Sequence, residues 1–177
     1  MSEQEKTRNT KRIFIKTTVK IIVIIILTVS LLLNLFTLVM PVVKYYGTSM
    51  SPTLEDGQIL IVSKLSEIES GDIIAFYYNN KVLVRRVAAV GNEQITIDVF
   101  GAVMVNGNEI EEPYIEDKTY GQCDIDFPFV VPSNTYFVLG DNREVAMDSR
   151  LQEISTVAED RVIGKIIFSI NPLGIVK

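Results

Sequence analysis

Three short segments hold residues whose types and spacing could carry chemistry rather than only strand or turn structure. The first, Gly47–Leu54, reads Gly-Thr-Ser-Met-Ser-Pro-Thr-Leu and presents the hydroxyl of Ser49. The second sets Arg85 and Arg86 side by side within an apolar run. The third, residues 140–150, is dense in Asp, Asn, Ser and Arg and follows another apolar run. Taken singly, each segment also fits a strand or a structural loop, and a serine between glycine and proline is typical of turns.

The chemistry open to these segments is limited because the chain contains no histidine. This excludes a Ser-His-Asp triad, a Cys-His pair and a histidine-ligated zinc site. Catalysis would have to use Ser, Lys, Arg, Asp, Glu or Tyr, and we expect neither a metal site nor a cofactor. The single cysteine, Cys123, cannot close an internal disulfide. We interpret it as a small, partly buried apolar residue rather than a reactive thiol.

The elements that would position these segments are mostly β-strands. Beyond Pro41, short runs rich in Val, Ile, Phe and Tyr alternate with turn residues, and helical periodicity is absent. Asn79-Asn80 and Asn106-Gly107 suit tight hairpin turns, and the polar residues 108–134 predict a long loop. The sequence therefore predicts a mostly β, antiparallel domain. The predicted strands are Gln58–Val62, Asp72–Tyr78, Lys81–Val90, Gln94–Val99, Ala102–Val105, Thr135–Leu139 and Arg161–Phe168.

An N-terminal anchor precedes this domain. Residues 21–40 carry no charge and, at about 1.5 Å per residue, cover a hydrocarbon core of roughly 30 Å. A buried core helix would show a polar face, and a cleavable signal peptide would end in a small-x-small site. Neither feature is present, so we predict an uncleaved transmembrane helix. Five basic residues lie within about 15 positions before it and only Lys44 just after it, which places residues 1–20 in the cytoplasm and residues 41–177 outside the cell membrane.

The charge of the chain is equally uneven. Of its 17 basic and 22 acidic residues, the first 40 positions hold six and two, which leaves residues 41–177 with a net charge of −9. Phosphate binding requires clustered Lys and Arg, so an acidic domain argues against nucleic acid as a partner. The partner that the anchor predicts is membrane lipid.

In their order and spacing, these segments resemble bacterial type I signal peptidases over essentially the whole chain. The resemblance implies a signal-peptidase-like antiparallel β domain tethered by one transmembrane helix. It also implies a task, the removal of signal peptides from exported proteins at the outer membrane face, with signal peptides or exported precursor proteins as partners. Besides the anchor and the serine segment, the matching motifs are Asp56-Gly57-Gln58, Gly71-Asp72-Ile73-Ile74, Val84-Arg85-Arg86-Val87, Val105-Asn106-Gly107, Glu112-Pro113-Tyr114, Tyr136–Arg143, Asp148-Ser149-Arg150 and Ile163-Gly164-Lys165.

The resemblance further implies roles for individual residues. The hydroxyl of Ser49 would be the nucleophile, and the N–H of Ser49, helped by Gly47, would form the oxyanion site. Asp148 and Arg150 would form an internal ion pair in a loop that braces the site. An extended substrate would pair with the strand around residues 82–87 through main-chain hydrogen bonds. The residues expected to contact it are Met50, Val82, Leu83 and Val84.

The sequence departs from this family at the general base. The family carries a lysine in a Val-Lys-Arg-Val strand motif, and this chain has Arg85 in that position, with Arg86 on the opposite face of the strand. Burial can lower the pKa of a lysine until it loses its proton, whereas a guanidinium keeps its proton in proteins. General-base assistance is worth about 10²–10⁴-fold in rate. Lys81, on the same strand face, lies roughly 13 Å away, and Asp148 would have to leave its arginine partner.

A second departure from the family concerns the same step, removal of the proton from the Ser49 hydroxyl. In active relatives a serine hydrogen-bonds the lysine amine and orients it, and the corresponding residue here is Ala146. We therefore favour the hypothesis of a non-cleaving homologue with a binding or assembly role. It would resemble Gram-positive family members that lack catalytic residues and support pilus assembly, with pilins as one class of client. The intact Ser49 segment favours a second hypothesis, an active serine endopeptidase with another base or with water. A third hypothesis is an anchored β domain without a peptide groove.

Overall fold

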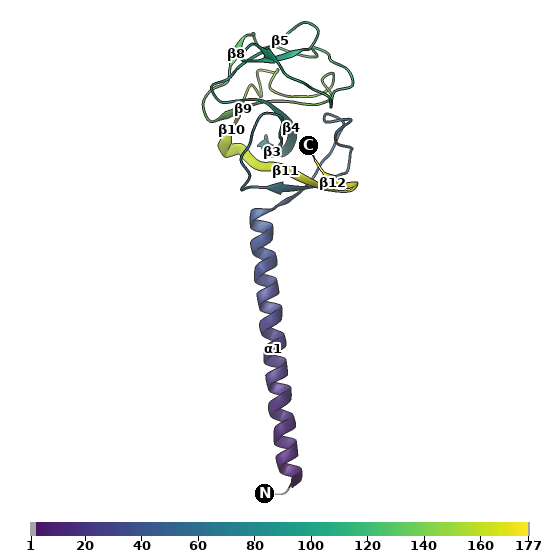
Figure 1. Ribbon diagram of the computed structural model, residues 1–177, viewed down its shortest axis with the longest axis vertical. Coiled ribbons are helices and arrows are strands. Elements are labelled where there is room, and N and C mark those ends of the chain that lie inside the picture. Colours follow the sequence, from purple (N-terminus) through teal and green to yellow (C-terminus); the bar gives the residue numbers. More distant parts are fainter. Residues whose placement is uncertain (1–2, 177) are drawn as a thin grey trace. The chain divides into compact units, whose positions relative to one another are not determined.

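The computed structural model describes residues 3–176, with side chains from residue 14 onward, and the chain forms two compact units, Met1–Val39 and Met40–Lys177 (Figure 1). The first unit holds the helix α1, Glu3–Val39, which begins well before the expected span of residues 21–40. An 18-residue stretch within its segment Phe14–Val39 has a mean hydropathy of 2.8, and the segment has no buried residue, so it is long and apolar enough to cross a membrane. The side chains of the basic residues before Phe14, on which the orientation partly rests, lie outside the described residues.

The second unit consists of short antiparallel strands in two sheets. In the described part of the chain, the larger sheet has the order β1-β2-β11-β3-β4-β9-β10, with β12 paired to β11, and the smaller has the order β7-β6-β5-β8. The strands are β1 (Val42–Lys44), β2 (Ile59–Ser63), β3 (Ile73–Tyr78), β4 (Lys81–Val90), β5 (Gln94–Ile97), β6 (Val103–Val105), β7 (Asn108–Glu109), β8 (Phe129–Val130), β9 (Thr135–Leu139), β10 (Val157–Ala158), β11 (Val162–Ile170) and β12 (Leu173–Ile175), with a 3₁₀ turn η1 at Glu159–Arg161.

The predicted mostly β, antiparallel architecture is confirmed, with one N-terminal apolar helix. All seven predicted strands are present, and β4 and β9 have the predicted bounds. Asn79, Asn80 and Asn106 have positive φ angles of 43°, 60° and 52°, as the two predicted hairpin turns require. Residues 108–134 form the predicted excursion, which contains only the two-residue strands β7 and β8.

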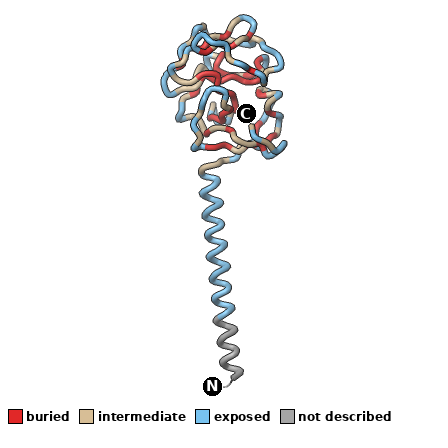
Figure 2. The backbone as a smooth tube through the Cα atoms, in the orientation of Figure 1, coloured by how far each residue is buried: buried red, intermediate tan, exposed pale blue. Residues whose placement is uncertain are grey.

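Buried residues concentrate along the strands of the second unit, whereas α1 is exposed from Phe14 to Leu38 (Figure 2). The strand β4 is buried from Val84 to Ala89 because its centre is covered on both faces. One core cluster also takes in Tyr45, Met50 and Leu54 from the segment around Ser49. The serine segment is therefore fixed to the sheet by the apolar side chains on either side of it.

The two neighbours of β4 cover different lengths of it. The strand β3 pairs with β4 over Lys81–Arg86, whereas β9 pairs with it only from Arg86 onward. The N–H and C=O of Val87 face β3, where they bond Asp72 and Gly71. Main-chain groups alternate in direction along an antiparallel strand, so those of Val84 and Val82 face the side on which β9 has ended. A free strand edge therefore begins next to Arg85.

Candidate functional site

The serine segment is a tight turn held from below. Within it the N–H of Ser51 donates to Thr48 O at 3.1 Å, and the N–H of Leu54 donates to Met50 O at 2.8 Å. Met50 and Leu54 are 0% and 1% exposed, so they pull the turn onto the core. Ser49 immediately precedes Met50 and is half-buried.

Arg85 lies directly against the hydroxyl of Ser49. Its Nη1 donates to Ser49 Oγ at 2.8 Å and to Val84 O at 2.6 Å, and its Nε donates to Met147 O at 2.9 Å. The residue is only 4% exposed. Burial lowers the pKa of the Arg85 guanidinium below its ordinary value, with a nearby Asp148 opposing the shift, yet a guanidinium remains protonated in proteins. The cation can donate to Ser49 Oγ but cannot take its proton.

Tyr45 is the second side chain in contact with Ser49, and the sequence did not single it out. Its hydroxyl lies 3.2 Å from Ser49 Oγ and accepts a 2.8 Å hydrogen bond from the N–H of Met50. The tyrosine precedes the serine by four residues, at the end of the short stretch that follows β1. Only the folded turn brings the two hydroxyls together, because four residues of extended chain would separate them.

The expected oxyanion site has one donor free and one engaged. The N–H of Gly47 donates to Asp56 Oδ1 at 2.7 Å. The N–H of Ser49 makes no hydrogen bond with any described residue. Gly47 has a φ of +98°, a conformation that favours glycine, and this directs its N–H toward Asp56. An oxyanion beside Ser49 would thus meet the Ser49 N–H, while the Gly47 N–H would first have to leave Asp56.

The loop after β9 braces the serine from the other side. The N–H of Asn142 donates to Ser49 O at 3.1 Å. Gly140 permits this approach, because a Cβ there would lie 2.6 Å from Ser49 O and 2.2 Å from the Cβ of Ala146. Ala146 is buried, and the carbonyl of the next residue, Met147, is the one that accepts from Arg85. A main-chain carbonyl therefore orients the arginine from the position next to Ala146.

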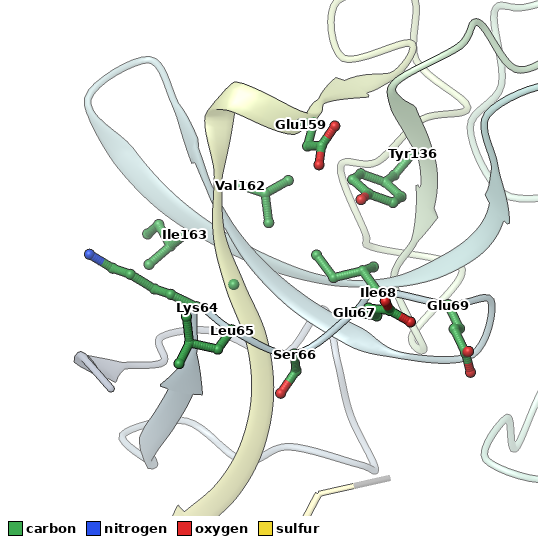
Figure 3. A pocket seen from close by; sticks show the side chains of 11 residues that line it. Lys64, Leu65, Ser66, Glu67, Ile68, Glu69, Tyr136, Glu159, Val162 and Ile163 are labelled. Carbon is green, nitrogen blue, oxygen red and sulfur yellow. The ribbon is translucent and has the colours of Figure 1, made fainter. Parts of the chain in front are cut away.

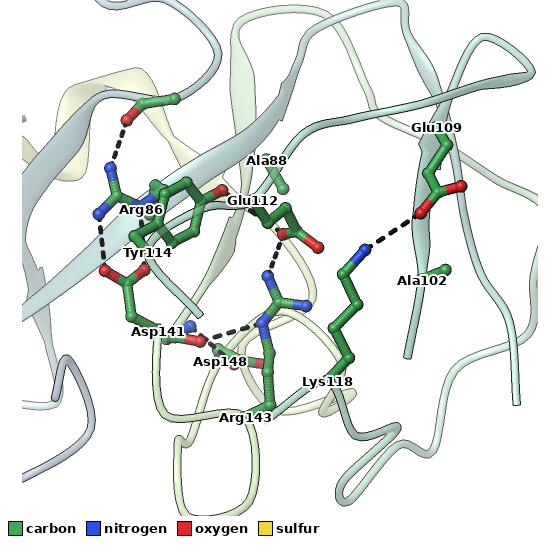
Figure 4. A network of polar contacts seen from close by, with 12 residues as sticks. Arg86, Ala88, Ala102, Glu109, Glu112, Tyr114, Lys118, Asp141, Arg143 and Asp148 are labelled. Atoms are coloured by element: carbon green, nitrogen blue, oxygen red, sulfur yellow. Dashed lines mark hydrogen bonds and ion pairs between the residues drawn. The ribbon is translucent and has the colours of Figure 1, made fainter. Parts of the chain in front are cut away.

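Three other buried arginines each have a carboxylate partner around this loop, and Figure 4 shows the pairs made by Arg86 and Arg143. The ion pair expected between Asp148 and Arg150 is present, with Nε 2.8 Å from Oδ1 and Nη2 2.8 Å from Oδ2. Asp148 also accepts from the N–H of Gly140 at 2.9 Å, so its carboxylate is fully engaged. The remaining pairs join Arg86 to Asp141 and Arg143 to Glu112.

Residue Tyr114 closes this network over Arg86. Its ring lies 3.7 Å from the guanidinium carbon of Arg86, a cation–π contact. Burial raises the pKa of Tyr114, and the adjacent charge of Glu112 adds to the rise. The motifs that contain Glu112, Tyr114 and Asp141 are visible in the sequence, but which side chains pair across 30 or more residues is not.

The other residues singled out from the sequence lie at different depths. On β4, Val82 is 41% exposed, Leu83 is half-buried and Val84 is buried. Met50 packs in the core beneath the serine, so its side chain is not on the surface that a peptide would touch. Lys81 pairs with Tyr78 at the hairpin end of β4 and makes no hydrogen bond to Ser49. No group of three or more metal-ligating residues occurs among the described residues.

A cavity of about 530 Å³ lies away from these residues (Figure 3). Its walls come from the segment after β2, the start of β9, the turn η1 and the start of β11, and they include Lys64, Glu67, Tyr136 and Glu159. None of its lining residues contacts Ser49 or Arg85 through a hydrogen bond. The candidate site is therefore the Ser49–Arg85 contact and the adjoining free edge of β4, a surface rather than an enclosed pocket.

Comparison with known proteins gives consistent matches over most of the chain. The family model described as "Signal peptidase, peptidase S26" matches residues 15–171. Signal peptidase IB of Staphylococcus aureus is 33% identical over 148 residues, which cover 72% of this chain and 76% of that protein. Signal peptidase I of Bacillus amyloliquefaciens is 36% identical over 138 residues, 71% of each chain. The crystal structure of a signal peptidase I from Enterococcus faecalis V583 is similar with a TM-score of 0.49 and 25% identity, covering 58% of this chain and 98% of that one.

Proposed function

Because this chain belongs to the type I signal peptidase family of membrane proteins, we propose that it is a non-cleaving member that binds signal peptides or exported precursors. The helix α1 anchors it through Phe14–Val39, with lipid around the helix, the N-terminus in the cytoplasm and residues 41–177 at the outer membrane face. The positive charges before the span support this orientation. Exported precursors are its clients, and pilins are one class of them.

The contact between Arg85 and Ser49 carries this proposal. Nucleophilic attack by a serine needs a group that accepts the hydroxyl proton. The cation that donates to Ser49 Oγ at 2.8 Å cannot accept one. No lysine, aspartate or glutamate hydrogen-bonds Ser49 among the described residues, and Asp148 is held by Arg150 and Gly140. The fold and the free edge of β4 remain available for peptide binding.

The test is a cleavage assay on the full chain in detergent with a fluorogenic signal-peptide substrate. We expect negligible turnover by the unmodified protein and by Ser49→Ala, and a partial gain in the double variant Arg85→Lys with Ala146→Ser. A lysine can lose its proton when buried, and the added hydroxyl would orient it. Cleavage by the unmodified protein that Ser49→Ala abolishes would overturn the proposal.

A second readout is the cell. If binding is the function, deletion of the gene gives an export or assembly phenotype that a Ser49→Ala copy restores, because the hydroxyl takes part in no reaction. A Ser49→Ala copy that fails to restore the phenotype, although present at the normal level in the membrane, would contradict a purely binding role.

One observation favours an active serine endopeptidase as the second candidate function. The hydroxyl of Tyr45 lies 3.2 Å from Ser49 Oγ, so a side chain that can accept a proton, unlike Arg85, is within reach. A tyrosine side chain can act as a general base, so this mechanism predicts a Ser49-dependent rate of cleavage. Loss of that rate in Tyr45→Phe, with unchanged peptide binding, would establish it.

A further inference from the structure

Arg85 differs from the other buried arginines in its charge balance. Arg86, Arg143 and Arg150 each form an ion pair with a carboxylate. Arg85 is equally buried at 4% exposed, yet its hydrogen-bond partners are a hydroxyl and two main-chain carbonyls. Within the described residues, no carboxylate forms an ion pair with it. A buried cation without an anion carries an uncompensated desolvation cost.

The charges around Arg85 do not make up for this. The carboxylates that act on the charge of Arg85 are those of Asp148 and Asp141, and the like charge that acts on it is that of Arg150. Asp148 is bound by both Nε and Nη2 of Arg150, and Asp141 by Nε and Nη2 of Arg86. Each pair is neutral as a whole, which leaves one net positive charge at the serine. The lowered pKa of Arg85 has the same origin, since burial is its main cause.

Two hydrogen-bond donors at or beside the Arg85 guanidinium have no partner among the described residues. A guanidinium has five N–H groups, and the three bonds of Arg85 use Nε and Nη1, which leaves Nη2 without a partner among the described residues. Nη2 is not among the fully enclosed side-chain atoms that lack a partner, so it is accessible. The N–H of Ser49 is the other unused donor. A planar carboxylate is the anion that matches such a fork of donors.

The guanidinium also lies at the open edge of the sheet. Its Nη1 donates to Val84 O, a carbonyl that faces the side on which β9 no longer covers β4. An extended peptide added to this edge would have its main chain in line with that carbonyl. A carboxylate at the end of the peptide main chain would therefore reach the guanidinium, whereas acidic side chains would point above or below the sheet.

We infer that Arg85, with the N–H of Ser49, forms a binding site for the C-terminal carboxylate of an extended peptide lying along the free edge of β4. The ligand class is a peptide with a free carboxyl end, such as a signal peptide that another enzyme has already cut. This inference rests on the proposed peptide-binding function and specifies what the site recognises. Arg85 would then bind the C-terminus of a peptide, whereas a lysine in this position would act as the general base for cleaving one.

The experiment measures binding to the full chain in detergent by fluorescence anisotropy. Three labelled decapeptides share one sequence and differ at the end: Ala-Leu-Ala with a free carboxylate, Ala-Leu-Ala amide and Ala-Leu-Glu amide. The small-x-small ending is the one left by signal-peptide cleavage. We expect the free acid to bind at least tenfold more tightly than either amide, because charge-assisted hydrogen bonds are lost in both.

Variants assign this preference to the site. Arg85→Gln should remove the preference for the acid, and Arg161→Gln should retain it, since Arg161 donates to Thr156 O, away from the serine. Melting temperatures with and without each peptide check that Arg85→Gln is folded, because a bound ligand raises them. The acid should raise the melting temperature of the unmodified protein more than the amides do.

The possible failures are distinguishable. Equal binding of acid and amide by the unmodified protein would overturn the carboxylate site while leaving peptide binding itself in place. Binding of the Glu amide as tight as that of the acid would overturn the assignment to a terminal carboxylate in favour of an acidic side chain. If none of the peptides binds, both this inference and the proposed function fall.

Discussion

At Arg85 and Arg86, two adjacent arginines of one strand serve opposite purposes. Arg86 is locked to Asp141 by two hydrogen bonds and covered by Tyr114. Arg85 has only neutral oxygens as partners and points to the serine. The alternation of side chains along β4 places Arg86 in an ion pair and Arg85 against the serine hydroxyl.

This contrast predicts different costs for removing each arginine. Arg86→Met would leave Asp141 buried and unpaired, so we expect the free energy of unfolding to fall by about 3–5 kcal/mol. Arg85→Met removes a charge that has no anion, and its loss of hydrogen bonds should be largely offset by relief of desolvation. Thermal unfolding of the two variants in the same detergent measures the difference. A drop in melting temperature for Arg85→Met as large as that for Arg86→Met would show that Arg85 stabilises the fold.

At the residue scale, the sequence predicted what a linear motif can contain. Ser49, Arg85 and the pair Asp148–Arg150 could be predicted because the family pattern marks their positions. Tyr45 was not, because its contact with Ser49 depends on how the turn folds back. The bond from Gly47 N–H to Asp56 is equally invisible in one dimension, since it depends on a positive φ angle and a return of the chain nine residues later.

Among the elements, the loop from Gly140 to Arg150 connects the site to the rest of the sheet. The loop follows directly on β9. The N–H of its residue Asn142 donates to Ser49 O, and the carbonyl of Met147 accepts a hydrogen bond from Arg85. Asp148 closes it internally through Gly140 N–H and Arg150. Its geometry therefore sets the distance between the serine turn and β4.

A substitution at Gly140 tests this coupling. A Cβ on Gly140 would clash with Ser49 O at 2.6 Å and with Ala146 at 2.2 Å, so we expect Gly140→Ala to cost about 1–3 kcal/mol of stability, the usual range for overpacking. Gly174→Ala is the matched control, because nothing lies within 4 Å of its Cβ position and its φ is not in the left-handed region. Differential scanning fluorimetry compares the two. Equal melting temperatures would mean that the loop can move away without loss.

The strands that the sequence did not predict are too short to show the alternating pattern by which a strand is recognised. Period-2 alternation needs about four residues to be recognised, which β4 and β9 supply and β7, β8 and β10 do not. These two-residue strands exist because a neighbour is already in place to pair with them, as β9 is for β10. The strand β5 also ends at Ile97, before the end of the predicted run, because residues 98–101 form a turn.

For the whole molecule, the chain divides into a helical unit, Met1–Val39, and a β unit, Met40–Lys177. The helix is longer than its uncharged part, since it starts at Glu3. The uncharged part was predictable because lipid requires an unbroken apolar run. The extra helical turns were not, because the polar residues before the span carry no amphipathic pattern that requires a helix.

The orientation can be measured by cysteine labelling in intact cells. In a Cys123→Ser background, the variant Lys118→Cys should react with a membrane-impermeant maleimide, because Lys118 is exposed on the β unit. The variant Ser2→Cys should react only after the membrane is permeabilised. The opposite pattern would place the β unit in the cytoplasm and exclude the proposed encounter with exported peptides.

The pairing of β4 separates the shape of the molecule from the chemistry at position 85. The main chain there is held in register by β3, through the pair Ile74↔Arg85, whatever side chain it carries. A change of side chain at this position can thus alter the chemistry next to Ser49 while the sheet keeps its pairing. The same backbone can therefore carry different side chains at position 85 in evolution, and it offers an engineer a fixed place at which to introduce a proton-accepting side chain next to Ser49.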